Sequence, residues 1–325
     1  MSFRMLKSAL IVTACLATCV VACTVCASAQ TRADSMTTTQ IHDLLEKIEM
    51  DDDIIYYIRL TSGDILTGPI REISSDSTGT SIRIYCQIGK ARVYIREIEY
   101  VGTYEAAYRQ KNRTFIMPTA APIGNDHFIG LWEIAFLYAG VGIADVVSIT
   151  AGRTFVPSVP SDQQASVVNI KATVYDAPNG LLEEGKQYYA VGVNGAWLND
   201  VNFLGHIYGV ATFTGRRTSV STMLFAKIMG KDIYTINGGT LFNNVQFPFA
   251  NGAIGVGLSL DSRVNHFHDA HFLAEIWCAD ITRPASTALF LGLRLNNTNL
   301  SSDFGITVAQ GPLILPSVAF SWTPF

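Results

Sequence analysis

Charged side chains are scarce in this chain. Asp, Glu, Lys and Arg make up 15% of its 325 residues, whereas about 25% is usual for a soluble domain. Apolar residues make up 49%, yet beyond the N-terminus no uninterrupted apolar run reaches the roughly 20 residues that a spanning helix needs. The apolar residues are therefore spread over short segments, a distribution that favours strands over helices.

Cysteine is also rare outside the N-terminus. The basic start with Arg4 and Lys7, the long apolar run and the final Ala-Ser-Ala before Gln30 are typical of a secretory signal peptide, predicted to span residues 1–29. Four of the 6 cysteines lie in this leader. The remaining two, Cys86 and Cys278, predict no disulfide framework.

An alternative processing pattern overlaps this leader. The sequence Val-Val-Ala before Cys23 resembles the lipobox of bacterial lipoproteins, which would make Cys23 a lipidated N-terminus. The Ala-Ser-Ala cleavage site is the cleaner match.

Familiar catalytic motifs are absent. The chain has no G-x-S-x-G, no H-E-x-x-H, no phosphate-binding loop and, outside the leader, no C-x-x-C. The formal net charge of −4 argues against a nucleic-acid partner. We therefore expect neither an enzyme nor a cofactor.

The apolar stretch from Asp126 to Phe155 resembles a membrane-spanning helix, but Glu133, four glycines and Asp145 interrupt it. With a period of two it predicts two strands joined by a turn at GVGIAD. The first strand is predicted to carry one set of side chains on one face, namely Trp132, Ile134, Phe136 and Tyr138. On the second strand, Val147, Ile149 and Ala151 are expected to oppose Ser148, Thr150 and Gly152.

The same alternation recurs to the C-terminus in segments of about ten residues, which is typical of a transmembrane β-barrel. Apolar residues alternate with small or polar ones in four further segments, around Val168–Val174, Tyr189–Trp197, Ile254–Leu260 and Leu289–Leu295. Residues 113–325 are therefore predicted to form a closed antiparallel barrel of about ten to twelve strands. Residues 231–249 show no clear period.

The region before the barrel has a different pattern. Thr37 to Met50 has helical spacing, so residues 30–53 are predicted to form a short helix and linker. Residues 54–104 are then predicted to form a small β domain of four or five strands. A Ser-Gly-Asp turn after the first strand and a final IREIEYV strand resemble SH3-like or Sm-like small barrels. A polar linker is expected from Tyr104 to Asn112.

A second resemblance covers residues 113 to the end. The segments RTFIMPT, GVGIADVVSITAG and YGVATFTG are similar to uncharacterised outer-membrane β-barrel proteins of Gram-negative bacteria. The resemblance implies an outer-membrane location, a periplasmic N-terminal domain, contact with outer-membrane lipid and no assigned activity. It also implies that the insertion machinery reads the terminal Phe325, although Pro324 and the register of Phe325 depart from the usual pattern.

Histidines are concentrated in one predicted turn. Imidazoles and a carboxylate there could hold a zinc or copper ion, and the candidate ligands are His266, His268, Asp269 and His271. A polar hairpin connection without metal explains the same residues equally well, because no further ligand from another part of the chain is evident.

Charges on the inward face are predicted to form a network in the barrel lumen, because charges cannot face lipid cheaply. The residues concerned are Glu133, Asp261, Arg263, Glu275 and Arg294. Glu275 and Arg294 are the expected ion pair, and a salt-bridged interior predicts an occluded pore.

Two alternatives remain open at the level of sequence. A secreted or lipid-anchored β-sandwich would pack its two apolar faces together, and an outer-membrane enzyme would bring carboxylates or histidines together at one rim.

Overall fold

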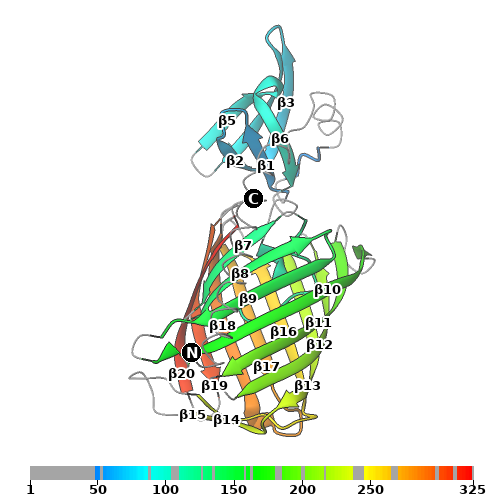
Figure 1. The fold of residues 1–325 in the computed structure, drawn as a ribbon. Helices are drawn as coiled ribbons and strands as arrows, with labels where there is room; N and C mark the ends of the chain where they lie inside the picture. The colour runs from blue at the N-terminus through cyan, green and yellow to red at the C-terminus, as the bar shows by residue number, and fades with distance from the viewer. Residues whose placement is uncertain are drawn as a thin grey trace, which may run out of the picture. The chain divides into compact units, whose positions relative to one another are not determined.

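The computed structural model describes residues 48–51, 54–86, 89–103, 110–125, 127–133, 136–156, 159–161, 164–179, 185–198, 202–215, 217–236, 245–264, 270–296, 300–309 and 313–323. The chain divides into two compact units, Met1–Gly102 and Thr103–Phe325 (Figure 1). Within the described residues, no helix has the length and apolar character needed to cross a membrane.

The N-terminal unit consists of two three-stranded antiparallel sheets, ordered β2-β1-β6 and β3-β4-β5. Its strands are β1 Tyr56–Leu60, β2 Ile65–Gly68, β3 Ile70–Asp76, β4 Gly79–Cys86, β5 Gly89–Tyr94 and β6 Ile98–Thr103. Only Pro69 separates β2 from β3, and its carbonyl accepts a hydrogen bond from the Tyr85 amide at 3.1 Å. The two sheets are therefore joined at this corner and enclose one apolar core.

Isoleucines dominate that core. Ile58, Ile70, Ile82 and Ile84 are each fully buried, and Ile48 packs against them. The Ser62-Gly63-Asp64 turn joins β1 to β2, as the sequence predicts, with Gly63 at a φ of 89°.

Two expectations for this unit need correction. The IREIEYV segment is not one strand, because Ile95–Glu97 forms a 3₁₀ turn (η1) before β6. Of the predicted helix, residues 37–47 lie outside the described residues, as does the leader with Cys23, and residues 48–50 are not helical. The resemblance to SH3-like or Sm-like barrels stays a prediction.

The second unit is a closed antiparallel barrel of twelve strands, at the upper end of the predicted number (Figure 1). Its strand order is β10-β11-β12-β13-β16-β17-β18-β19-β20-β7-β8-β9. The bounds are β7 Phe128–Glu133, β8 Phe136–Ile143, β9 Val147–Thr154, β10 Ala165–Asn179, β11 Gly185–Leu198, β12 Phe203–Thr214, β13 Thr218–Gly230, β16 Ile254–Arg263, β17 Ala270–Cys278, β18 Thr287–Asn296, β19 Leu300–Ala309 and β20 Leu313–Trp322. Pairing of Ala319 with Glu133 and of Trp322 with Gly130 closes the barrel.

The predicted alternation holds along the wall. On β18, Leu289, Leu291, Leu293 and Leu295 are exposed, whereas Ala288, Phe290, Arg294 and Asn296 are buried. The same division recurs on β10, β11 and β16. Apolar side chains therefore face outward and polar or small ones face the lumen.

The first predicted strand is in fact two. The chain turns back between Glu133 and Phe136, which pair with each other at the end of the β7–β8 hairpin. Trp132 is consequently outside and 52% exposed, while Tyr138 lies inside with the lumen cluster. The turn predicted at GVGIAD is present, with Ala144 and Asp145 at positive φ.

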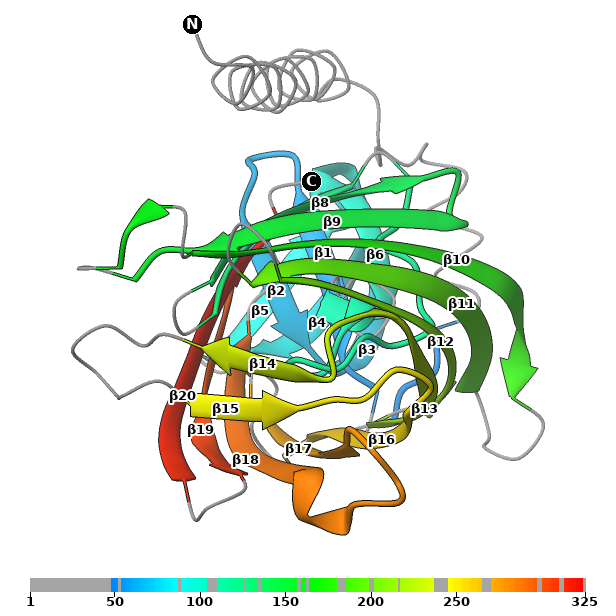
Figure 2. The same ribbon diagram turned by 60° about the horizontal axis from the view of Figure 1, so that its bottom comes forward.

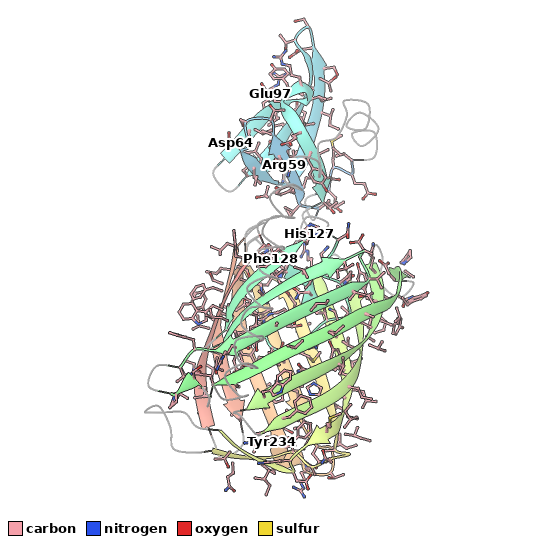
Figure 3. All side chains as sticks on the ribbon, viewed as in Figure 1. Arg59, Asp64, Glu97, His127, Phe128 and Tyr234 are labelled. Carbon is pink, nitrogen blue, oxygen red and sulfur yellow. The ribbon has the colours of Figure 1, made fainter. Side chains whose placement is uncertain are left out.

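A short hairpin covers one end of the barrel. Strands β14 Ile233–Ile236 and β15 Val245–Pro248 pair with each other within the connection from β13 to β16 (Figure 2). Figure 3 shows Tyr234 at this end and His127 and Phe128 at the other. Tyr234 is fully buried, and its hydroxyl donates to the carbonyl of Phe203 at 3.1 Å.

Two glycines in the wall give a matched test of this packing. A Cβ on Gly142 would clash with the carbonyl oxygen of Gly124, whereas a Cβ on Gly209 would meet nothing within 4 Å. We expect Gly142→Ala to lower the free energy of unfolding by about 1–3 kcal/mol through overpacking. Gly209→Ala should change it by less than about 0.5 kcal/mol.

Guanidinium titration of both variants in detergent micelles measures the difference. Equal stability of the two variants would contradict the close approach of β8 to residues 124–127.

Candidate functional site in the barrel lumen

Residues 110–125, here called the plug, lie inside the barrel rather than in its wall. The first barrel strand begins at Phe128, within the stretch where the sequence predicts it, and the last three residues of the expected linker form the buried turn η2 Gln110–Asn112. Residues 104–109 lie outside the described residues. Within the plug, Arg113 and Pro118 form an isolated antiparallel β-bridge, and the Thr114 amide donates to the carbonyl of Met117 at 3.0 Å.

Glu275 on β17 holds the tip of the plug. Its carboxylate accepts hydrogen bonds from three consecutive backbone amides, those of Phe115, Ile116 at 3.1 Å and Met117 at 3.0 Å. Glu275 is 1% exposed. A buried carboxylate requires such partners because burial without hydrogen bonds is costly, so the plug and this side chain satisfy each other.

Arg294 on β18 anchors the neighbouring residue. Its guanidinium donates to both carboxylate oxygens of Asp303, each at 2.7 Å, and also to the carbonyl of Thr114. A third nitrogen pairs with Asp261 at 3.2 Å. Such bidentate arginine–carboxylate geometry fixes orientation as well as charge, which positions Arg294 for its contact with the plug.

Arg113 and Lys171 attach the two sides of the plug. Arg113 pairs with Glu133 on β7 at 2.8 Å. The ammonium of Lys171 on β10 donates to three plug carbonyls, those of Asn112, Thr119 and Ala121, at 3.4, 2.7 and 2.6 Å. The wall therefore supplies a carboxylate to plug amides and cations to plug carbonyls.

Hydroxyl groups complete the attachment. Thr212 accepts from the Ala120 amide at 2.8 Å, and Thr173 donates to the Ala120 carbonyl at 2.7 Å. Ser148 accepts from the Ile123 amide at 3.0 Å. Backbone groups of the plug thus find partners on several strands, as buried backbone groups must.

One aromatic contact adds an apolar component. Phe115 is fully buried and stacks on Phe290 of β18, with ring centroids 3.9 Å apart and an interplanar angle of 4°. Leu131, Leu273 and Ala319 pack around this pair. The tip of the plug is therefore fixed by both hydrogen bonds and packing.

All five charges predicted for the lumen are buried: Glu133, Asp261, Arg263, Glu275 and Arg294. The expected contact between Glu275 and Arg294 is wrong, because Glu275 binds plug amides and Arg294 pairs with Asp261 and Asp303. Sequence reasoning missed Asp303 and Arg113, although the alternation on β19 places Asp303 on the inward face.

The predicted metal cluster stays a prediction. His266, His268 and Asp269 lie outside the described residues. His271 is buried, and its Nδ1 lies 2.6 Å from the Asp261 carboxylate. The described part of the chain contains no group of three or more His, Cys, Asp or Glu side chains arranged for a metal ion.

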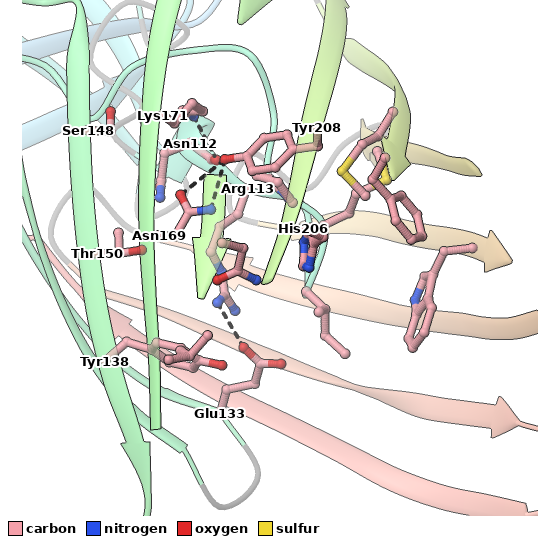
Figure 4. Close-up of a pocket in the computed structure, with 18 of the residues that line it drawn as sticks. Asn112, Arg113, Glu133, Tyr138, Ser148, Thr150, Asn169, Lys171, His206 and Tyr208 are labelled. Carbon is pink, nitrogen blue, oxygen red and sulfur yellow. Dashed lines mark hydrogen bonds and ion pairs between the residues drawn. The ribbon is translucent and has the colours of Figure 1, made fainter. Parts of the chain in front are cut away.

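A cavity of about 300 Å³, here called the chamber, remains between the plug and the wall (Figure 4). The plug contributes Asn112, Arg113, Ile116 and Met117, and the wall contributes residues of β7 to β13 and β17. Phe249, just after β15, also lines it. Figure 4 shows the Arg113–Glu133 and Asn169–Tyr208 pairs around this space.

The hairpin end of the barrel is tied down by Lys227 of β13. Its ammonium donates to the carbonyls of Lys231 and Phe249 and lies over the rings of Tyr234 and Phe249, 4.9 and 5.4 Å from their centroids. Cation–π contacts of this kind strengthen when they are desolvated, and Lys227 is 1% exposed. This buried cation therefore adds to the Tyr234–Phe203 hydrogen bond in holding the β14–β15 hairpin, here called the cap, to the wall.

Comparison with known proteins shows similarity only at the level of solved structures. No family model and no curated protein matches the chain. The KdgM porin in complex with disordered oligogalacturonate is similar with a TM-score of 0.36 and 8% identity, over 61% of this chain and 95% of that one. A triple mutant of the Rhodopseudomonas blastica porin gives a TM-score of 0.30 and 11% identity, over 83% and 96%. At these values the similarity says nothing about function.

Removal of the Glu275 carboxylate should release the plug. We expect Glu275→Ala to destabilise the protein by about 3 kcal/mol or more, because three buried amides would lose their acceptor and each unpaired group costs about 1–3 kcal/mol. Limited proteolysis should then cleave within residues 113–118, which are protected in the wild type.

Ser259→Ala is the matched control. Ser259 makes a single side-chain bond to Thr114, at 2.7 Å, so its loss should cost about 1 kcal/mol and leave the plug protected. Unchanged proteolysis of Glu275→Ala would argue against this anchoring.

Proposed function

We propose that this protein is an integral outer-membrane β-barrel whose lumen is occluded by its own plug, with a restricted-permeability or binding role and no catalysis. The observation that carries the proposal is the polarity of the wall. Long apolar side chains are exposed around its outside, and the buried charges of its strands point inward. In water this arrangement would expose a large apolar surface to solvent, which is unfavourable. In a bilayer the apolar outer face contacts lipid and the polar residues stay inside.

Strand lengths support a membrane-spanning wall. Strands β16 to β20 have 10, 9, 10, 10 and 10 residues, and a tilted transmembrane strand needs about 9–11.

Outward-facing aromatic residues gather near the two ends of the wall. At one end Tyr189 lies between Tyr175 and Phe213, with centroid distances of 5.6 and 6.2 Å. At the other, Trp197 and Phe203 are 5.3 Å apart. Aromatic girdles at both interfaces are typical of outer-membrane barrels.

The connections suggest an orientation. On the side where β7 begins, they span 144–146, 180–184, 215–217, 264–269 and 297–299. On the other side they include the longer 155–164, 231–253 and 279–286. Periplasmic turns are short and extracellular loops longer, so we assign the β7 start and the N-terminal unit that precedes it to the periplasm.

The interior supports a non-catalytic role and disfavours the sandwich alternative. Among the described lumen residues, the carboxylates of Glu133, Glu275 and Asp303 are each engaged with the plug or with an arginine that binds it. A sandwich would bury its apolar faces against each other, whereas the apolar face here is exposed.

Two equally exposed residues test the bilayer. Leu291 in mid-strand and Val146 in a short turn are both 45% exposed. Leu291→Arg should cost about 2–4 kcal/mol in lipid vesicles, because the charge would face hydrocarbon, and Val146→Arg about 0–1 kcal/mol. Unfolding titrations in vesicles measure both, and equal tolerance would argue against a surrounding bilayer.

Occlusion predicts the electrical behaviour. Planar-bilayer recordings of the wild type should show little or no steady conductance, because the plug fills the lumen. Glu275→Ala should show intermittent openings, and Ser259→Ala should stay closed. A large, steady wild-type conductance would overturn the occluded state and favour an open porin.

A further inference from the structure

Four polar atoms that line the chamber have no hydrogen-bond partner among the described residues. They are Oδ1 of Asn112, Nη2 of Arg113, Oδ1 of Asn194 and Nδ1 of His206, all buried. Buried polar atoms are nearly always paired. Four unpaired atoms around one cavity indicate that the cavity is shaped for an occupant with complementary groups.

The four atoms come from two parts of the chamber lining, here called the plug pole (Asn112 and Arg113) and the wall pole (Asn194 and His206). Asn112 and Arg113 belong to the plug, while Asn194 on β11 and His206 on β12 are directly opposed in the strand register. The plug pole offers an unused N–H donor from Arg113 beside its pairing with Glu133. The wall pole offers an amide oxygen, an acceptor that needs a donor.

The charge of the lining favours an anion. Its formally charged residues are Arg113, Glu133 and Lys171. Lys171 Nζ lies within hydrogen-bond distance of three carbonyl oxygens, a set of acceptors that favours its ammonium form. The lining thus carries one net positive charge, which one negative charge on the occupant would balance.

The remaining lining is apolar and aromatic. Leu204, Met223, Phe225, Phe249 and Trp277 supply it, and the ring of His206 lies 5.8 Å from that of Phe225. A volume of about 300 Å³ is at the small end for ligand pockets. The occupant's body is therefore small and apolar, of the size of a single substituted ring.

We propose that the chamber binds a small hydroxylated aromatic monocarboxylic acid. The carboxylate binds Arg113 at the plug pole, the hydroxyl donates to Asn194 at the wall pole, and the ring packs beside Phe225 and Trp277. This proposal rests on the plugged lumen of the proposed function but not on its membrane location or its lack of conductance.

Isothermal titration calorimetry on the full-length protein in detergent tests the chemistry with four related probes. Phloretate, which has both groups, should bind with one site per chain. Hydrocinnamate, which lacks the hydroxyl, should bind about fivefold more weakly, and methyl phloretate, which lacks the charge, at least about tenfold more weakly. Tyramine, with a cation in place of the carboxylate, should not bind.

Variants of the wall locate the site. Asn194→Leu should lower the affinity for phloretate to that for hydrocinnamate and leave the affinity for hydrocinnamate unchanged. A general loss of fold would lower both affinities. Val167→Trp fills the chamber and should abolish binding, and Val168→Trp, the adjacent outward position, should not.

Three results would overturn the proposal: no heat with phloretate, equal affinities for phloretate and its methyl ester, or unchanged binding by Val167→Trp. The first would leave water as the only occupant, and the second would indicate nonspecific apolar uptake. Since binding in detergent requires neither a bilayer nor a closed pore, these results are distinguishable from failure of the conductance and vesicle tests.

Discussion

The contact between the Glu275 carboxylate and three amides of the plug is the interaction on which the position of the plug in the lumen depends. A carboxylate that is 1% exposed is stable only if its oxygens accept good hydrogen bonds, and a tight turn leaves amides pointing the same way with no partner of their own. Each group therefore compensates for the desolvation of the other. Arg294 extends this coupling, because it joins the Thr114 carbonyl to Asp303 and Asp261 on the wall.

The need for a plug follows from the size of the barrel. About eight strands enclose an interior that side chains alone fill, and the diameter grows roughly in proportion to strand number. Twelve strands leave more room than Arg294 and Phe290 and their neighbours occupy, so a segment of chain enters. Its backbone brings amides and carbonyls into the lumen, and this explains why inward positions such as Lys171, Thr173 and Thr212 are polar rather than apolar.

The wall was predictable from sequence because the alternation of apolar and polar side chains is a local property of each strand. It can be recognised wherever the strand pairing is regular. The period fails at bulges: Ile228 and Met229 are both outward and exposed, because the register of β13 against β12 shifts there. The plug was not predictable. It has no period, and its partners lie far away in sequence, with Glu275 158 to 160 positions from the amides it binds. The alternation predicted an inward Glu275, although Trp277 on the same face blurs that prediction. Only the three-dimensional register shows that plug amides, not Arg294, reach Glu275.

The distribution of satisfied and unsatisfied groups separates the structural part of the lumen from the part available for binding. Where the plug meets the wall, amides, carbonyls and charges are paired. On the chamber side, atoms of Asn112, Arg113, Asn194 and His206 are buried without partners, at about 1–3 kcal/mol each if nothing fills the space. Leucine at Asn194 would remove part of that cost without disturbing any plug contact. A cluster of buried polar atoms that breaks a rule of packing around one cavity is typical of a functional site. Because Met117 of the plug, Phe249 just after β15 and the unpaired atoms all line the same cavity, the unpaired groups belong to one site, apart from the contacts that hold the tip of the plug.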